Sequence, residues 1–331
     1  MEARKLKEAE ACMAAGAKCT KTGFFGKWKA DWESAASEYE RAATSFRVAK
    51  ALPQAVDAYQ QAARAHEQME CAYMAAKHLE SGAHLLRELG RADESASLYE
   101  RASALHHGDG ALVQAAEALV KAARVLDGKD DARAGALVIR ACAIVEEEED
   151  VGKLRACVET YKQAVALLLR SQRCVDAAEL LSKQAALHAR LQQGHGVARC
   201  ELSVVVAHLA ANDFDGAEAA YASALARGGG DFAGSDEAAS AEALLRAFSC
   251  QSEEQLAAAV GGQPFTYLEN QVVRLARALT LRSADVPVSK LTTAAAALSV
   301  GPRAAGAAGA AGAGDFGEVA PEEDIDEDDL T

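Results

Sequence analysis

The chain has 331 residues, half of them apolar but only 5% aromatic, and a formal net charge of −14. No stretch approaches the run of about 18 apolar residues that a membrane-spanning helix needs, and a chain this acidic is not expected to bind nucleic acid. The charged N-terminus does not resemble a signal peptide, and the eight cysteines include no C-x-x-C pair, so we expect reduced thiols in the cytoplasm.

Residues 21–30 combine aromatic side chains with lysines in a glycine-containing segment. The residues that stand out are Phe24, Phe25, Trp28, Lys21, Lys27 and Lys29. One interpretation is an interhelical loop whose phenylalanines fold back onto the first helical hairpin. The other is a membrane-contacting loop, because burying one Phe contributes about 1.5–3 kcal/mol and each Lys near an anionic leaflet about 1 kcal/mol. Such a contact would be weak and reversible.

From residue 35 onward one pattern recurs at a regular step, as in AASEYERAA (35–43), AVDAYQQAA (55–63) and SASLYERAS (95–103). Each unit holds a large residue with small residues four before it and three or four after it. The large residues are Tyr39, Tyr59, Leu79, Tyr99, Leu119, Ile139 and, after a slip of two, Tyr161 and Leu181. Residues at these spacings lie on one face of a helix. Each unit therefore predicts a helix of about 14–16 residues and a short turn. We therefore predict an all-α, TPR-like superhelical array of antiparallel helix hairpins over residues 1–193.

The pattern weakens after residue 193, where we predict a C-terminal helical cap or bundle over residues 194–282. The expected helices are one over 212–225 capped by Asn212 or Asp213, one opened by the capping box at 252–255, and one over 264–282.

Two low-complexity segments follow the predicted cap. Residues 283–314 form an alanine- and glycine-rich linker, and residues 315–331 form a disordered acidic tail with nine acids and no base. The tail is either an inert solubilising segment or a docking element, in which Leu330 supplies a short-range apolar contact after long-range attraction by the acids.

No motif in the sequence indicates catalysis, because Walker A, H-E-x-x-H and G-x-S-x-G patterns do not occur. The histidines, such as His106 and His107, have no cysteine at metal-ligand spacing, so we assign them structural or solvent roles. The acidic run 146–150 predicts a solvated turn, with a cation site as the alternative. We expect no enzymatic activity, no cofactor and no metal.

The stretch KTGFFGKWKADWESAASEYERAATSF, which begins at Lys21, resembles the N-terminal signature of the soluble NSF attachment proteins (SNAPs), most of all the gamma branch of that family. NDFDGAEAAY, FAGSDEAASAEALLRAF and FTYLENQVVRLARAL extend the resemblance over residues 1–282. It implies an adaptor that binds an assembled SNARE four-helix bundle of syntaxin-like proteins. The adaptor then recruits and stimulates the hexameric NSF ATPase, which disassembles the bundle in vesicle fusion and intracellular protein transport. The resemblance also implies a cytoplasmic protein peripherally associated with endomembranes.

The same resemblance implies roles for individual residues. Phe24 and Phe25 match the membrane-contacting loop, with Trp28 and its lysines as a gamma-like extension. Leu330 matches the terminal leucine through which SNAPs stimulate NSF, and its acidic neighbours that would dock on basic patches of NSF are Asp326, Glu327, Asp328 and Asp329.

For the SNARE-facing surface the family uses basic residues on its repeat helices. Lys162 lies where such a lysine is expected, and four others recur two residues after the central large residue as one predicted stripe: Arg41, Arg101, Lys121 and Lys183. The alternative interpretation is that these residues are ordinary solvated charges on the helix surfaces. Glu117 stands where the family has a lysine, which argues against transferring the contacts one by one.

One rival interpretation belongs to a different functional class. A TPR-like scaffold that binds a soluble peptide or protein unrelated to membrane fusion would have the same repeats. It predicts no membrane contact by residues 21–30 and no function for Leu330, so removing the tail distinguishes the two.

Overall fold

The computed structural model describes residues 2–21, 29–227 and 232–281. Every regular element in these ranges is helical, which confirms the all-α class. The elements are α1 (Glu2–Cys19), α2 (Trp32–Val48), α3 (Leu52–Gln68), α4 (Ala72–Glu88), α5 (Ala92–Gly108), α6 (Leu112–Leu126), α7 (Asp131–Glu146), α8 (Val151–Arg170), α9 (Cys174–Arg190), α10 (Gly194–Ala210), α11 (Phe214–Ala226), α12 (Asp236–Ser249), α13 (Glu253–Val260), the 3₁₀-helix η1 (Gln263–Tyr267) and α14 (Asn270–Arg277).

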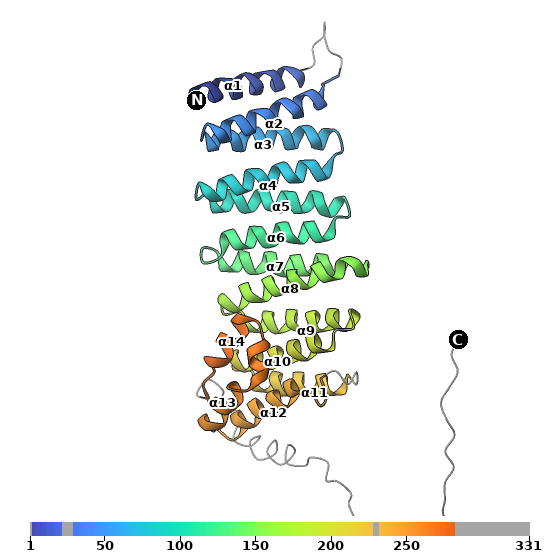
Figure 1. Cartoon of the computed structure of the whole chain (residues 1–331), viewed down its shortest axis with the longest axis vertical. Coiled ribbons are helices and arrows are strands. Elements are labelled where there is room, and N and C mark those ends of the chain that lie inside the picture. Colours follow the sequence, from blue (N-terminus) through green and yellow to red (C-terminus); the bar gives the residue numbers. More distant parts are fainter. Residues whose placement is uncertain (1, 22–28, 228–231, 282–331) are drawn as a thin grey trace, which may run out of the picture.

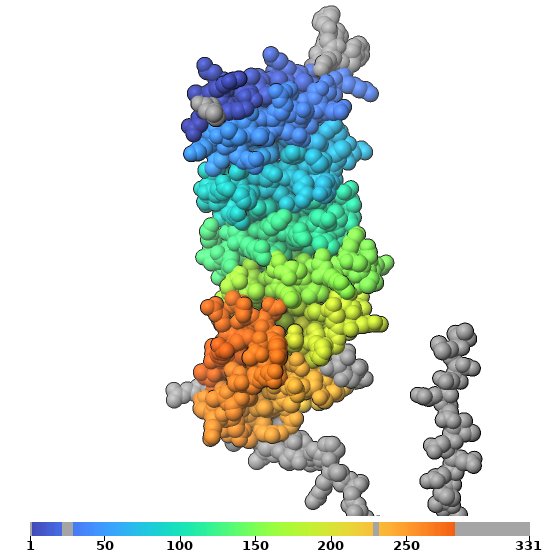
Figure 2. Space-filling model, in the orientation of Figure 1, coloured from blue at the N-terminus to red at the C-terminus, as the bar shows by residue number. Residues whose placement is uncertain are grey.

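The helices α1 to α11 stack side by side into an elongated array, in which each helix packs on the next in the sequence (Figure 1). The remaining helices do not extend the stack in the same way. They turn back so that α14 packs on α8 and α10. In the space-filling view this C-terminal end, coloured orange, covers one side of the lower part of the array (Figure 2).

The predicted central residues form the core of the array. Tyr59 is 8% exposed, while Ala55, Ala62 and Ala63 around it are fully buried. Of the eight central residues seven are buried, and Ile139 is half-buried. Alanine favours helix and leaves a shallow hollow on its surface, so a neighbouring helix approaches closely and receives the large side chain. The sequence pattern is thereby explained as helix-to-helix packing.

Short turns with one left-handed residue end most units of the repeat, and the turn between α7 and α8 is the exception within the described array. The helices α2 to α5 each have 17 residues, slightly more than the sequence predicted. In the first turn Lys50 has φ 57°, and the amide of Ala51 donates to the carbonyl of Phe46 at 2.9 Å. The same bond joins Cys71 to His66 at 2.9 Å. This Schellman geometry satisfies carbonyls that the helix end would otherwise leave unpaired.

The slip of two before Tyr161 comes from α8, which is 20 residues long and packs on α6 as well as on α7 and α9. The acidic run before it differs from the sequence expectation. Glu148 is buried rather than solvated. Its Oε1 accepts from the amide of Asp150 at 3.1 Å, and its carbonyl accepts from the guanidinium of Arg190 at 3.4 Å.

The repeat does not weaken at residue 194 as the sequence indicated, because α9, α10 and α11 begin at 174, 194 and 214. The pattern is hidden in the sequence because Glu201 occupies the position of the large central residue. Its carboxylate is buried against Arg227, whose Nη1 lies 3.1 Å from Oε1. The predicted boundaries of the cap, linker and tail stay predictions.

Two of the three expected cap helices begin where predicted, and the third is divided. Asp213 caps α11 by accepting from the amide of Gly216 at 2.9 Å, and Ser252 caps α13 by accepting from the amide of Gln255 at 3.3 Å. The segment 264–282 contains η1 and then α14 instead of one helix. The break lets Phe265 and Leu268 both enter the core before α14 turns onto α8 and α10.

Candidate functional site

Polar contacts join helices of the array to the helix two further along, past the one between them. These contacts are Glu40–His78 at 2.9 Å (α2 to α4), Glu80–Lys121 at 2.8 Å (α4 to α6), Glu67–Arg101 at 3.0 Å (α3 to α5) and Glu146–Lys183 at 3.0 Å (α7 to α9). Alternate helices therefore share a face. We call α2, α4, α6 and α8 the even layer, and α3, α5, α7 and α9 the odd layer.

The two layers carry opposite charge. The four helices of the even layer contain ten lysines and arginines against seven acids, whereas those of the odd layer contain six against nine. The overall acidity of the chain is thus not distributed evenly over the array. A long anionic ligand would favour the even layer by charge alone.

A groove of about 330 Å³ opens on the even layer, and basic side chains surround one carboxylate in it. Arg47 from α2, Lys77 from α4 and Lys121 from α6 line it, with Glu80 among them. Glu80 accepts from Lys121 Nζ at 2.8 Å and contacts His106 Nε2 at 3.2 Å. Burial alone would raise the pKa of Glu80, but the hydrogen bonds from His106 and Lys121 and the nearby positive charges lower it to about 2. The carboxylate is therefore ionised at neutral pH.

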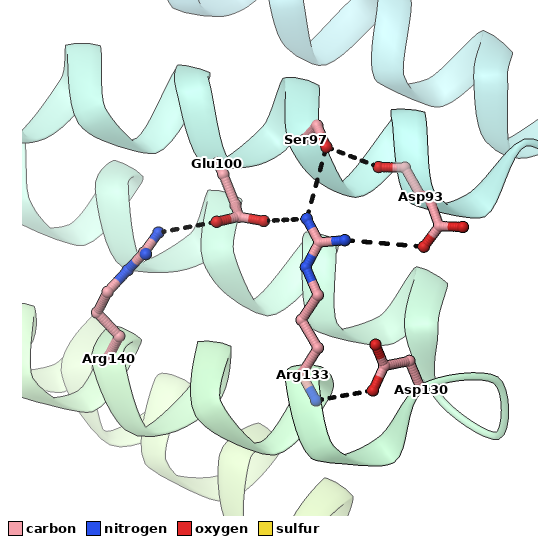
Figure 3. A network of polar contacts seen from close by, with 6 residues as sticks. All are labelled: Asp93, Ser97, Glu100, Asp130, Arg133 and Arg140. Atoms are coloured by element: carbon pink, nitrogen blue, oxygen red, sulfur yellow. Dashed lines mark hydrogen bonds and ion pairs between the residues drawn. The ribbon is translucent and has the colours of Figure 1, made fainter.

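The odd layer presents a denser ion-pair network, shown in Figure 3. Arg133 of α7 reaches across to α5, where its guanidinium contacts Glu100 at 2.5 Å and Asp93 at 3.7 Å. Arg140 contacts the other oxygen of Glu100 at 3.6 Å. Asp130 caps α7 by accepting from the backbone amide of Arg133 at 3.0 Å. A groove of about 580 Å³ beside this network is lined by α5 and α7, including Arg101.

The structure does not bring the predicted SNARE-contacting residues into one stripe. Lys121 and Arg41 belong to the even layer, and so does Lys162 on α8, whereas Arg101 and Lys183 belong to the odd layer. All five are in ion pairs. Arg41 contacts Glu38 at 2.7 Å and Lys162 contacts Glu269, in the segment before α14, at 3.2 Å.

The two predicted peripheral contacts lie largely outside the described residues. These are Phe24, Phe25, Lys27 and Trp28 in the first loop, and Leu330 with its four acidic neighbours in the tail. Lys21 and Lys29, at the edges of the loop, are exposed, and the amide of Asp31 donates to the carbonyl of Cys19 at 3.0 Å. That bond holds the C-terminal end of α1 beside the N-terminal end of α2. No helix in the described ranges is long and apolar enough to cross a membrane.

One cluster was not predicted from the sequence. Glu40, His66 and His78 come from α2, α3 and α4, and their ligand atoms lie within 4.8 Å of one another. Both imidazole Nε2 atoms approach the same oxygen, Glu40 Oε1, at 2.8 and 2.9 Å. The signal that indicates it is a repeat, because a Glu and a His at a separation of 26 in the sequence recur one hairpin further on as Glu80 and His106.

Comparison with known proteins gives a consistent result over most of the chain. A family model described as soluble NSF attachment protein, SNAP, matches residues 5–262. The gamma-soluble NSF attachment protein of Dictyostelium discoideum is 31% identical over 281 residues, which cover 85% of each chain. That of Arabidopsis thaliana is 28% identical over 267 residues, covering 81% of this chain and 89% of the relative. Among solved structures, BtubC from P. vanneervenii aligns over 67% of this chain and 89% of its own, with a TM-score of 0.36 and 15% identity.

The family match begins within α1 and extends through α13, so it covers almost the whole array and part of the C-terminal cap. The resemblance that the sequence motifs indicated is confirmed by this match and by both gamma-type relatives. The chain belongs to the soluble NSF attachment protein family.

Proposed function

We propose that this protein is an adaptor that binds assembled SNARE complexes and recruits the NSF ATPase to disassemble them in vesicle-mediated transport. The observation that carries the proposal is membership of a family defined by NSF attachment, over residues 5–262. The elongated array supports it, because a long, layered helical surface suits a rod-like helical bundle better than a small ligand. In this role the catalytic step belongs to NSF.

The even layer is the surface that we propose for the SNARE bundle. It carries the excess of basic residues, and its groove holds Lys121 beside Arg47 and Lys77. Lys162 extends the same layer onto α8. Arg101 and Lys183 stay candidates from the sequence, but a single straight bundle lying on the even layer would not reach them.

The existing ion pairs do not prevent such binding. The side chains of Lys121 and Lys162 are 40% and 39% exposed, and exposed ion pairs contribute only about 0.2–1 kcal/mol. An acidic partner can therefore replace Glu269 at Lys162 with little loss. Lys121 donates to a more deeply buried carboxylate, so it would serve as a bridge between Glu80 and the partner.

The first loop and the tail supply the two other contacts of the proposed adaptor. Phe24, Phe25 and Trp28, with Lys21, Lys27 and Lys29, would touch an anionic membrane and hold the protein peripherally on endomembranes. The tail would dock on NSF through Leu330 and its acids. The linker 283–314 separates that tail from the last described helix, and a long tether lowers the effective concentration of a docking element.

Immobilised SNARE bundles, purified NSF and ATP test the proposal. The forms compared are the intact chain, a chain ending at Gly314, Leu330→Ala and, as a matched control in the same tail, Ile325→Ala. We expect the intact chain and Ile325→Ala to capture NSF and release SNAREs, and the other two to bind the bundle without release. If the intact chain never binds the bundle, the proposal is wrong and a scaffold for a soluble partner takes its place. If it binds and Leu330→Ala still releases SNAREs, the adaptor role stands and the tail assignment is wrong.

A further inference from the structure

We propose that Glu40, His66 and His78 form a binding site for a divalent transition metal of the zinc class, which ties α2, α3 and α4 together. Two imidazoles and one carboxylate are a ligand set that zinc uses in proteins, with a fourth position left for water or an added ligand. The site lies in the N-terminal part of the array, and none of its three residues is among the individual contacts proposed above for SNAREs and NSF.

The three ligand atoms already converge. Nε2 of His66 and Nε2 of His78 lie 2.8 and 2.9 Å from Glu40 Oε1. Ligands of a tetrahedral zinc at about 2.0–2.1 Å lie about 3.3 Å apart, so the two nitrogen–oxygen separations have to open by about half an ångström. The three ligand atoms lie within 4.8 Å of one another, so the two nitrogens are already within reach of one ion. The glutamate can supply that movement, because its side chain is 38% exposed while the imidazoles are 12% and 13% exposed.

Packing orients the two rings. His66 and His78 stack with centroids 5.1 Å apart and planes at 14°, and Tyr59 stacks on His78 with centroids 6.1 Å apart. Of the two imidazole contacts with Glu40, only the one from His66 has hydrogen-bond geometry. Nε2 of His78 is buried without a hydrogen-bond partner in the described part of the chain, although it lies close to the carboxylate.

The next hairpin provides an internal comparison. Glu80 and His106 repeat the first pair there, but Ala118 stands where His78 would be. Lys121 of α6 contacts the carboxylate of Glu80 at 2.8 Å and so brings a positive charge to this second pair. In the described part of the chain no lysine or arginine pairs with Glu40. A bound metal ion would supply the positive charge that Lys121 supplies in the second hairpin.

Binding of Zn²⁺ to the metal-stripped full-length protein tests the site, measured by competition with a chromophoric chelator. The exposed thiols of Cys71 and Cys250 are alkylated first, because they are alternative zinc ligands. His78→Gln removes a ligand, and His106→Gln makes the same change in the neighbouring pair as a matched control. Replacing groups that merely orient a metal ligand weakens binding about 10–100-fold, so loss of a ligand should weaken it at least about 100-fold. We expect one Zn²⁺ per chain, lost in His78→Gln and unchanged in His106→Gln.

Cobalt provides a second readout that does not depend on affinity. With Co²⁺ we expect d–d absorption bands without a thiolate-to-cobalt charge-transfer band, and the d–d bands should vanish in His78→Gln. If that variant does not fold by circular dichroism, Glu40→Gln, which keeps both rings, replaces it. The proposal is overturned if the alkylated protein binds no Zn²⁺, or if the ligand variant binds as tightly as the control. Binding lost equally in both histidine variants would overturn it as well.

Discussion

The middle of the array and its C-terminal end each hold a glutamate against a base at the same sequence separation of 26, with opposite electrostatic results. In the array Glu80 meets His106, and in the C-terminal end Glu201 meets Arg227. The pKa of Glu80 is lowered to about 2, whereas burial raises the pKa of Glu201. The formal charge of the partner does not explain this, because arginine is the stronger base.

The number of donors and the depth of burial explain the difference. Glu80 is contacted from two helices, α5 and α6, and its side chain is 14% exposed. Glu201 is 4% exposed and meets a single arginine that is itself half in solvent. Desolvation therefore dominates at Glu201, and hydrogen bonding with nearby charge dominates at Glu80. Lys121 from a third helix reaches Glu80, whereas Arg227 is the ion-pair partner of Glu201 in the described part of the chain.

The largest expected effect concerns one fully buried leucine of the array and one half-buried leucine of the last helix. Leu79 is fully buried in the array, whereas Leu275 of α14 is only half-buried. We expect Leu79→Ala to lower the free energy of unfolding by about 3–4 kcal/mol, and the same change at Leu275 by about 1 kcal/mol. Urea denaturation followed by circular dichroism measures both. Equal losses would mean that the side chain of Leu275 is as tightly packed as that of Leu79.

A smaller effect distinguishes the two glutamates by pH. The folded-state pKa of Glu80 lies below its unfolded value of 4.5, so its contribution is complete above pH 4.5 and is lost as the pH falls toward about 2. That loss is at most about 3 kcal/mol. Glu201 has the opposite sign, because its pKa is raised and protonation relieves its burial as the pH falls.

The stability of the intact protein and of two variants between pH 7 and pH 3 checks these signs. Glu80→Gln should flatten the loss of stability in acid. Glu201→Gln should raise stability at pH 7 and make the loss in acid steeper than in the intact protein. A profile that changes in the same direction for both variants would contradict the comparison.

Sequence reasoning identified the repeat but not the layers. The central residues from Tyr39 to Leu181 recur because helix packing requires a large residue among small ones, and this is visible from one unit to the next. Successive units place their side chains on opposite faces of the array, because alternate helices belong to the same layer. The same face therefore recurs only at every second unit. Arg101 and Lys121, which lie in successive units, therefore belong to different faces although they occupy the same position in their units.

Two further features depend on contacts that a sequence does not display. Glu201 interrupts the apolar pattern, and it is tolerated only because Arg227 reaches it from the end of α11. The convergence of Glu40, His66 and His78 requires three helices to pack in the observed register. A Glu–His separation of 26 is not a known metal signature, so only its recurrence in the next hairpin points to a paired geometry.

Removing the base beside each glutamate tests the role of donor number. Arg227→Ala leaves Glu201 buried without its partner, which should destabilise the protein by about 2 kcal/mol. Lys121→Ala leaves Glu80 bonded to His106, and we expect less than about 1 kcal/mol. The double variant Arg227→Ala with Glu201→Gln should recover most of the loss. If it does not, the arginine stabilises the protein through packing of its aliphatic stem rather than by pairing the carboxylate.

The smallest effect expected concerns the binding of SNAREs, and it separates the layers. Lys121→Ala and Lys162→Ala should each weaken capture of the intact protein by immobilised SNARE bundles about twofold to fivefold, as an exposed charge pair of about 0.5–1 kcal/mol predicts. Arg101→Ala and Lys183→Ala, the matched changes on the odd layer, should leave capture unchanged. The two even-layer losses should shrink as salt is raised, because exposed charges are screened. Loss of capture in the odd-layer variants alone would place the bundle on the acidic layer. Charge would then not select the face, and the groove around Glu80 would serve only to hold α4, α5 and α6 together.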